Sequence, residues 1–276
     1  MLKKFWQEIG VQAAVLARAE QVLRENEALF AGLPLHEWRT APYEEGLSAL
    51  KGALGEDADG MKLFVAQSME ALLALREYGE RGIGRGIFTA TMEFLARFSE
   101  VVYVRRGCVE WRWGWWFPRQ LALREFRLGA LEYEMTEGAA FGGKPAGGDR
   151  RRIFLHIPAD ADLSDGAVDA SVAEARAFFS KYFPAYRDVE YVCSSWMLSP
   201  ALSGILPETS RVRRFGERFS VVFWEEDSPA FRDWIFPAAA SAPAEDLPES
   251  TSLQRAVKRH LLAGGKIGWA EGRWKG

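Results

Sequence analysis

The first hundred residues place apolar side chains at the spacing of an α-helix. Apolar residues recur three or four positions apart over four stretches, which are residues 2–30, 44–54, 61–78 and 87–102. Gly32 and Pro34 follow the first stretch and are expected to end its helix. The pattern predicts a helical N-terminal domain over residues 1–102.

The spacing changes after this region. Apolar residues alternate with polar ones or glycine from Val109 to Trp115, which predicts a strand whose tryptophans pack on a helix or line a ligand groove. The alternation over residues 124–135 changes phase at Gly129, which predicts a β-bulge within one strand. The glycine-rich residues 136–150 predict a mobile hairpin loop.

Residues 151–224 follow the order strand, helix, strand, helix, strand. The apolar run RRIFLHIP stops at Pro158, which cannot donate to a sheet ladder. Helical spacing follows over 168–182, and residues 189–192 resume a strand. Two strands joined through one helix are expected to run parallel, with a right-handed crossover.

The C-terminal ends of two such strands are where a ligand is expected to bind, here around His156 and Trp196. Ser164 and Ser171 are alternative caps for the start of the intervening helix. Farther on, Thr251 and the glutamine three residues later form a capping pair that opens a late helix.

Composition narrows the class of protein. The chain has 276 residues with 48% hydrophobic and 26% charged side chains, and its formal net charge is −3. This composition is typical of a globular protein. The negative net charge provides no overall positive potential that would attract nucleic acid or an anionic membrane. Two cysteines do not make a disulfide framework, so a cytoplasmic location is expected. Three scattered histidines do not have the spacing of a zinc site, so no metal is expected.

Several segments, in order, resemble one family. They are FRLGALEYE, FLHIP, SVAEARAFFSKYFP, CSSWMLSP and TSLQRAVKRHLLAGG. They resemble a bacterial group of GNAT-like acyltransferases, whose members carry a helical N-terminal domain, and the resemblance covers nearly the whole chain. It implies an α+β fold, in which the helical domain packs on a GNAT-like mixed α/β sheet domain over residues 103–276. It also implies acyl-CoA as a co-substrate.

The resemblance places acyl-CoA along the loop after the first parallel strand, the start of the helix and the end of the second strand. The residues that we expect to bind it, with two arginines from the following helix, are Ile157, Ser164, Gly166, Ser195, Trp196, Arg211 and Arg214. For Trp196, filling the core is the alternative role.

The loop itself differs from the R/Q-x-x-G-x-G/A pattern of typical GNAT enzymes, whose backbone N–H groups and helix N-terminus hold a pyrophosphate. Its sequence, ADADLSDGAVDAS, carries four aspartates that would repel a pyrophosphate. The arginines of the following helix either bind the phosphates instead or form a solvated helix face.

His156 and Glu134 are the candidate catalytic bases. A neutral imidazole at the strand end would accept a proton from an amine, which typically contributes roughly 10²–10⁴-fold to a rate. The alternative is a hydrogen-bonded, inert histidine. Glu132 and Glu134 share one strand face, which either meets a cleft or, as we favour, faces solvent. Cys193 has no cationic neighbour in sequence, so a buried structural thiol is favoured over a nucleophile.

These observations favour an acyl-CoA-dependent N-acyltransferase, in which the amine of a small-molecule acceptor attacks the thioester directly. The alternative is a non-catalytic small-molecule binding module, which keeps the GNAT-like fold and has lost CoA binding because of its acidic loop.

Overall fold

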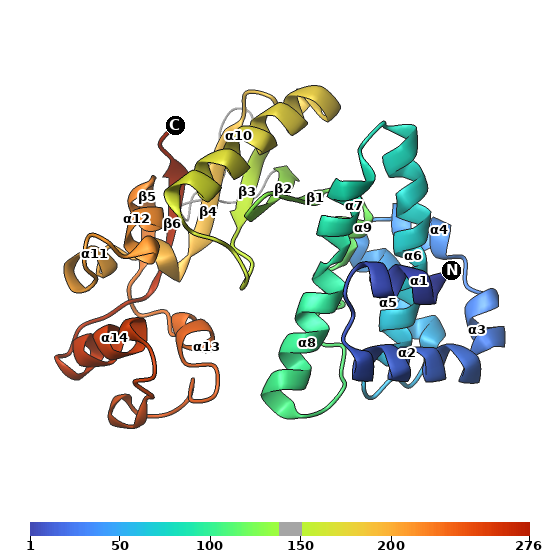
Figure 1. The fold of residues 1–276 in the computed structure, drawn as a ribbon, viewed down its shortest axis with the longest axis horizontal. Coiled ribbons are helices and arrows are strands. Elements are labelled where there is room, and N and C mark those ends of the chain that lie inside the picture. The colour runs from blue at the N-terminus through green and yellow to red at the C-terminus, as the bar shows by residue number, and fades with distance from the viewer. Residues whose placement is uncertain (138–150) are drawn as a thin grey trace. The chain divides into compact units, whose positions relative to one another are not determined.

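The computed structural model describes residues 1–137 and 151–276 (Figure 1). The predicted glycine-rich loop lies almost wholly outside the described residues. The chain divides into two compact units, Met1–Leu128 and Gly129–Gly276. The domain limit expected between residues 102 and 103 stays a prediction. None of the described helices is both long and apolar enough to cross a membrane.

The first unit is helical, as expected. Its helices are α1 (Leu2–Glu8), α2 (Ala13–Glu25), α3 (Glu27–Ala31), α4 (Leu35–Thr40), α5 (Tyr43–Leu54), α6 (Met61–Glu80), α7 (Arg85–Met92), α8 (Phe94–Arg106) and α9 (Pro118–Leu121). The helices expected at 44–54 and 61–78 are confirmed. The single helix expected over 2–30 is wrong, because Gly10 has a φ of +76° and Gln12 caps a new helix through its side chain. The stretch 87–102 likewise forms two helices, which meet at Glu93.

The strand predicted between Val109 and Trp115 is also wrong. The backbone N–H of Trp111 donates to the carbonyl of Asp59, which lies in a turn, so it does not join a sheet ladder. The Trp111 indole donates to Gln67 on α6 at 2.8 Å and its ring packs edge-on against Phe64. The tryptophan therefore packs on a helix as expected, but from a loop, because helical side chains supply its hydrogen bond and its aromatic contact.

The second unit is built on a mixed sheet. Its strands are β2 (Leu131–Glu137), β3 (Arg151–His156), β4 (Glu190–Ser195), β5 (Phe219–Glu225) and β6 (Trp269–Trp274), and they lie in the order β2-β3-β4-β6-β5. Its helices are α10 (Asp165–Tyr182), α11 (Leu202–Ile205), α12 (Arg211–Glu217), α13 (Phe231–Ile235) and α14 (Ser252–Leu262). The remaining strand, β1 (Glu125–Leu128), ends the first unit. Gly129, with a φ of +60°, forms a turn between β1 and β2, so the expected bulge is in fact the end of one strand and the start of another.

Strands β3 and β4 run parallel, which confirms the central expectation from sequence. Helix α10 connects them and lies across the sheet (Figure 1). The Ser171 hydroxyl of α10 contacts β2 by accepting the Leu131 backbone N–H at 3.2 Å and lying 2.9 Å from the Tyr133 hydroxyl. These contacts fix which face of the sheet α10 covers, and that face carries Tyr133 rather than its neighbours Glu132 and Glu134.

The segment after β5 builds a small core of its own. Phe231, Ile235, Phe236 and Leu247 are buried there with Trp196 and Val257. Helix α14 starts with the expected capping box, in which Thr251 and Gln254 satisfy each other's backbone N–H groups.

Candidate active site

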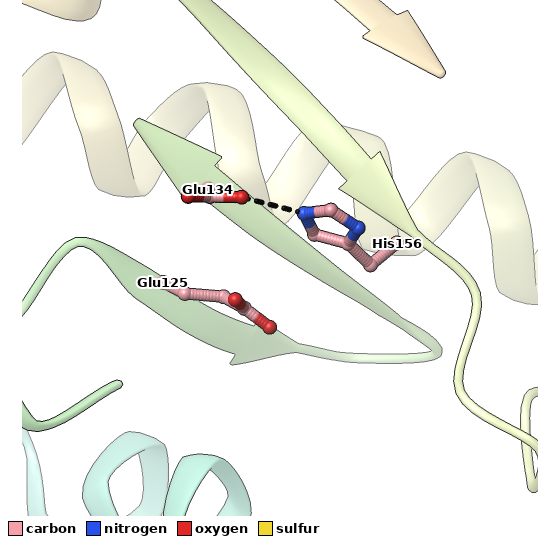
Figure 2. A group of neighbouring side chains, drawn as sticks. All are labelled: Glu125, Glu134 and His156. Atoms are coloured by element: carbon pink, nitrogen blue, oxygen red, sulfur yellow. Dashed lines mark hydrogen bonds and ion pairs between the residues drawn. The ribbon is translucent and has the colours of Figure 1, made fainter. Parts of the chain in front are cut away.

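Glu134 and His156 form a hydrogen-bonded pair on the sheet face opposite α10. His156 is the last residue of β3, and the antiparallel register of β2 and β3 places it across from Glu132 and diagonal to Glu134. Its Nε2 lies 2.9 Å from Glu134 Oε2 (Figure 2). A carboxylate in this position orients the ring and stabilises the charged imidazolium. The two candidate bases, which were identified separately from sequence, are therefore one unit.

The environment of this pair differs from the one favoured from sequence. Glu132 and Glu134 are 5% and 8% exposed, so the interpretation that they face solvent is wrong. The His156 side chain is 24% exposed. Burial weakens the competition from water, so the attraction between a carboxylate and an imidazolium is stronger here than at a surface.

The parallel ladder ends beside this pair. The last residues matched between β3 and β4 are Leu155 and Cys193, whereas β4 continues to pair with β6 through Ser195. Strand β4 therefore continues past the last position at which it is matched to β3. In parallel α/β units, the ends of such strands are where ligands bind.

Residues expected to bind CoA lie around these strand ends, in different surroundings. Ile157, directly after β3, is half-buried. Ser195 is 7% exposed, and its hydroxyl accepts the Met197 backbone N–H at 3.1 Å. Trp196 is 6% exposed and belongs to the apolar cluster with Phe231 and Val257, so it fills the core. Cys193 is buried, and burial raises the pKa of its thiol well above the ordinary value, as expected for a structural cysteine.

Helix α10 begins at the acidic loop. Ser164 is its N-cap residue, but the hydroxyl does not accept a helical N–H; it donates instead to Asp162 at 3.0 Å. A second bond, from the Ser164 backbone N–H to Asp162, has a length of 2.9 Å, and these two bonds lower the pKa of Asp162. Gly166 is exposed in the first turn of the helix, where an added Cβ would meet nothing within 4 Å.

Two arginines of α12, Arg211 and Arg214, and Arg218 directly after the helix face these aspartates. We call the group the aspartate–arginine cluster; it consists of Asp162, Asp165 and Asp169 with Arg211, Arg214 and Arg218. Arg211 lies 3.3 Å from Asp162, Arg218 lies 3.1 Å from Asp165, and closer pairs join Arg214 to Asp165 and Arg218 to Asp169. Three carboxylates are thus matched by three guanidinium groups, so the start of α10 does not carry the unopposed negative charge that its sequence suggested. Neither the cluster nor the Glu134–His156 pair could be recognised as a unit from sequence, since the residues that pair in them lie 22 to 53 residues apart.

Two family profiles match the chain in the same order as its two units. The profile of the N-acyltransferase N-terminal domain matches residues 1–123, and that of the GNAT-like C-terminal domain matches residues 126–274. The chain belongs to the GNAT-like acyltransferases with an N-acyltransferase N-terminal domain. The resemblance inferred from sequence is therefore confirmed, together with the α+β fold class.

Solved structures share the fold of this GNAT-like protein. An acyltransferase in complex with CoA and 10C-teicoplanin aligns with a TM-score of 0.76 and 22% identity, and the match covers 99% of this chain and 86% of that one. The structure of an acyltransferase in complex with decanoyl-CoA gives the same score, identity and coverage. No protein of curated function matches the chain.

Proposed function

We propose that this GNAT-like protein transfers an acyl group from acyl-CoA to an amine of a small-molecule acceptor. The observation that carries the proposal is the parallel β3–β4 ladder, which ends beside the hydrogen-bonded Glu134–His156 pair. The fold neighbours bound to CoA, decanoyl-CoA and 10C-teicoplanin support an acyl-CoA donor and a small-molecule acceptor.

The proposed chemistry is direct attack in a ternary complex. The amine nitrogen attacks the thioester carbonyl carbon, a C–N bond forms, the C–S bond breaks and CoA leaves as a thiolate that is then protonated. The proton that the amine loses passes to the Glu134–His156 pair. Glu134 stabilises the resulting imidazolium by Coulomb attraction, and it also holds the ring in position while the proton moves.

The aspartate–arginine cluster supports a donor site at the start of α10. A pyrophosphate would compete with the three carboxylates for guanidinium groups that already lie at the helix start. Arg214 is half exposed and its side chain is therefore accessible to such a phosphate. In this proposal Ser164, Gly166, Arg211 and Arg214 bind the phosphates, and Ile157 and Ser195 line the acyl-bearing arm.

Donor binding is tested by calorimetry with CoA and decanoyl-CoA. Arg214→Gln is expected to weaken binding by about tenfold, the value of one charge-assisted hydrogen bond to phosphate. Arg259→Gln, on the exposed side of α14, is the matched control and is expected to leave the affinity unchanged. Absence of binding by the wild-type protein would favour the alternative, a small-molecule binding module that has lost CoA.

Turnover is tested by thiol release from decanoyl-CoA in the presence of a panel of primary amines. His156→Gln is expected to lower kcat by roughly 10²–10⁴-fold, and Glu134→Gln to lower it less, because the imidazole remains. His36→Gln, at an exposed position, is the control. The limb of the pH–rate profile that reports the base should disappear in His156→Gln. If that variant instead keeps full turnover and an unchanged profile, the pair has no part in the mechanism.

A further inference from the structure

Strand β5 exposes a run of apolar side chains that a folded unit ordinarily buries. The whole stretch of residues 220–227 is exposed. Within it Val221, Val222, Phe223 and Trp224 are exposed by 39%, 41%, 41% and 37%. A surface strand usually alternates, with apolar residues toward the core and polar residues toward water, so four consecutive exposed apolar residues are unusual.

The apolar residues lie on both faces of the sheet. Val221 is opposite Gly272 of β6, and Phe223 is opposite Glu271. Cross-strand partners share a face and successive residues of β6 point to opposite faces, so Val221 and Phe223 lie on opposite faces. A ligand or helix packed on one face would cover only half of these side chains. A strand added alongside β5 would contact both sets.

The outer edge of β5 is available for such a strand. In the described part of the sheet, β5 pairs with β6 on one side and is the last strand on the other. An edge strand presents a row of backbone N–H and C=O groups, and natural edges are usually protected by charged residues, proline or bulges. Here the central four residues carry no charge and no proline. The one protective feature is a register shift between Val221 and Phe223.

We propose that β5 is a homodimer interface, in which the β5 strands of two copies pair antiparallel about a two-fold axis near Val222. A second copy is the occupant that fits, because the strand is complementary to itself. Its apolar centre would meet the same apolar centre, and its bulge would meet a strand with the same local bend.

The charges at the two ends favour the same partner and direction. Lys275 lies beside the start of β5, where its backbone N–H donates to the Arg218 carbonyl; the Arg218 guanidinium itself is paired with Asp165 and Asp169. Glu225, Glu226 and Asp227 lie exposed at its other end, where Lys266 pairs with Glu226 and Asp227. Antiparallel self-pairing brings Lys275 of each copy toward the acidic end of the other, where three carboxylates outnumber the single lysine, whereas parallel pairing would place the two acidic ends together.

This interface is independent of acyl transfer. Strand β6 and strand β4 separate β5 from β3, so the dimer would leave the end of the β3–β4 ladder uncovered in each copy. The proposal therefore stands or fails separately from the proposed reaction.

The first test is the mass of the full-length protein in solution at micromolar concentration, measured by light scattering coupled to gel filtration. The wild-type protein is expected to have the mass of two chains, and Phe223→Lys the mass of one. Leu262→Lys on α14 is the matched control, since Leu262 is also an exposed apolar residue, at 56%, and belongs to a helix rather than to the edge strand. It is expected to remain a dimer. The proposal would be overturned if the wild-type protein is a monomer, including a monomer that binds only a different protein. A dimer that survives Phe223→Lys would overturn it as well.

The second test reads the pairing register. In a Cys108→Ser background, Val222→Cys is expected to form an intermolecular disulfide on mild oxidation, because the two-fold axis places both copies of this residue side by side. The remaining cysteine, Cys193, is buried. Leu262→Cys is expected to stay uncross-linked. A dimer whose Val222→Cys variant does not cross-link more than the Leu262→Cys variant would show that β5 is not the contact.

Discussion

Glu70 gives a prediction whose size can be worked out from the structure. It lies in the middle of α6 and is 4% exposed. Burial raises the pKa of its carboxyl from 4.5 to about 8, and the positive charge of Arg39 only partly opposes this shift. Glu70 is therefore mostly protonated at neutral pH in the folded first unit, and ionised in the unfolded chain.

The sign and the magnitude follow from this difference. Below pH 4.5 both states bind the proton, and the stability associated with the neutral carboxyl is fully present. As the pH rises from 4.5 toward about 8 the unfolded state loses its proton first, so the free energy of unfolding falls by about 1.4 kcal/mol per pH unit. The total loss is on the order of 4–5 kcal/mol, and the curve flattens above pH 8 because both states are then ionised.

The perturbation is Glu70→Gln, which keeps the shape of the side chain and removes its titration. Urea unfolding is followed by tryptophan fluorescence across this pH range, and the stability of the variant relative to wild type is expected to rise steadily with pH. Glu80→Gln, on the exposed last turn of the same helix, is the control and is expected to show a nearly constant difference. Parallel pH profiles for wild type and Glu70→Gln would refute the assignment of a neutral buried carboxyl.

Four further predictions each concern a single position. Gly60→Ala is expected to destabilise the first unit by at least about 2 kcal/mol in urea unfolding, because the backbone there has a φ of +70° and the new Cβ would lie 2.2 Å from the Trp111 carbonyl oxygen. Gly52→Ala, in open space within α5, should instead stabilise it by about 0.5–1 kcal/mol, and equal effects of the two changes would contradict this reasoning. Thr251→Ala is expected to cost about 1 kcal/mol in the same assay through loss of the capping box, and an unchanged midpoint would mean that this cap contributes nothing. Labelling of Cys193 by a thiol reagent should follow the rate of unfolding, whereas rapid labelling of the native protein would show that the thiol is accessible.

The local pattern of apolar and polar residues was sufficient to predict most elements of the second unit. The helical spacing over 168–182 predicted α10, and a strand before and after one helix favoured the parallel arrangement seen in β3 and β4. The capping pair at Thr251 was likewise readable, because its two residues are separated by a single helical turn. These features depend on neighbours in sequence, and so the sequence alone determined them.

The predictions that were wrong concern stretches whose local pattern of apolar and polar residues is compatible with two arrangements. Alternating tryptophans from Trp111 to Trp115 fit a strand, but they fit equally well a loop in which the Trp111 indole donates to Gln67 of α6, and the docking of that loop decided the outcome. Glu132 and Glu134 fit an exposed strand face, and their burial followed from what covers that face rather than from their own spacing.

The residues of the candidate site could be named from the sequence, but only the tertiary structure determined how they lie relative to one another. His156 and Glu134 could each be named from sequence, but their hydrogen bond depends on the register between β2 and β3, which residue spacing does not encode. The docking of α12 beside the start of α10 determined in the same way that Asp165 meets Arg214 and Arg218. Periodicity fixes which face of an element is apolar, whereas contacts between distant residues are set only when those faces pack together.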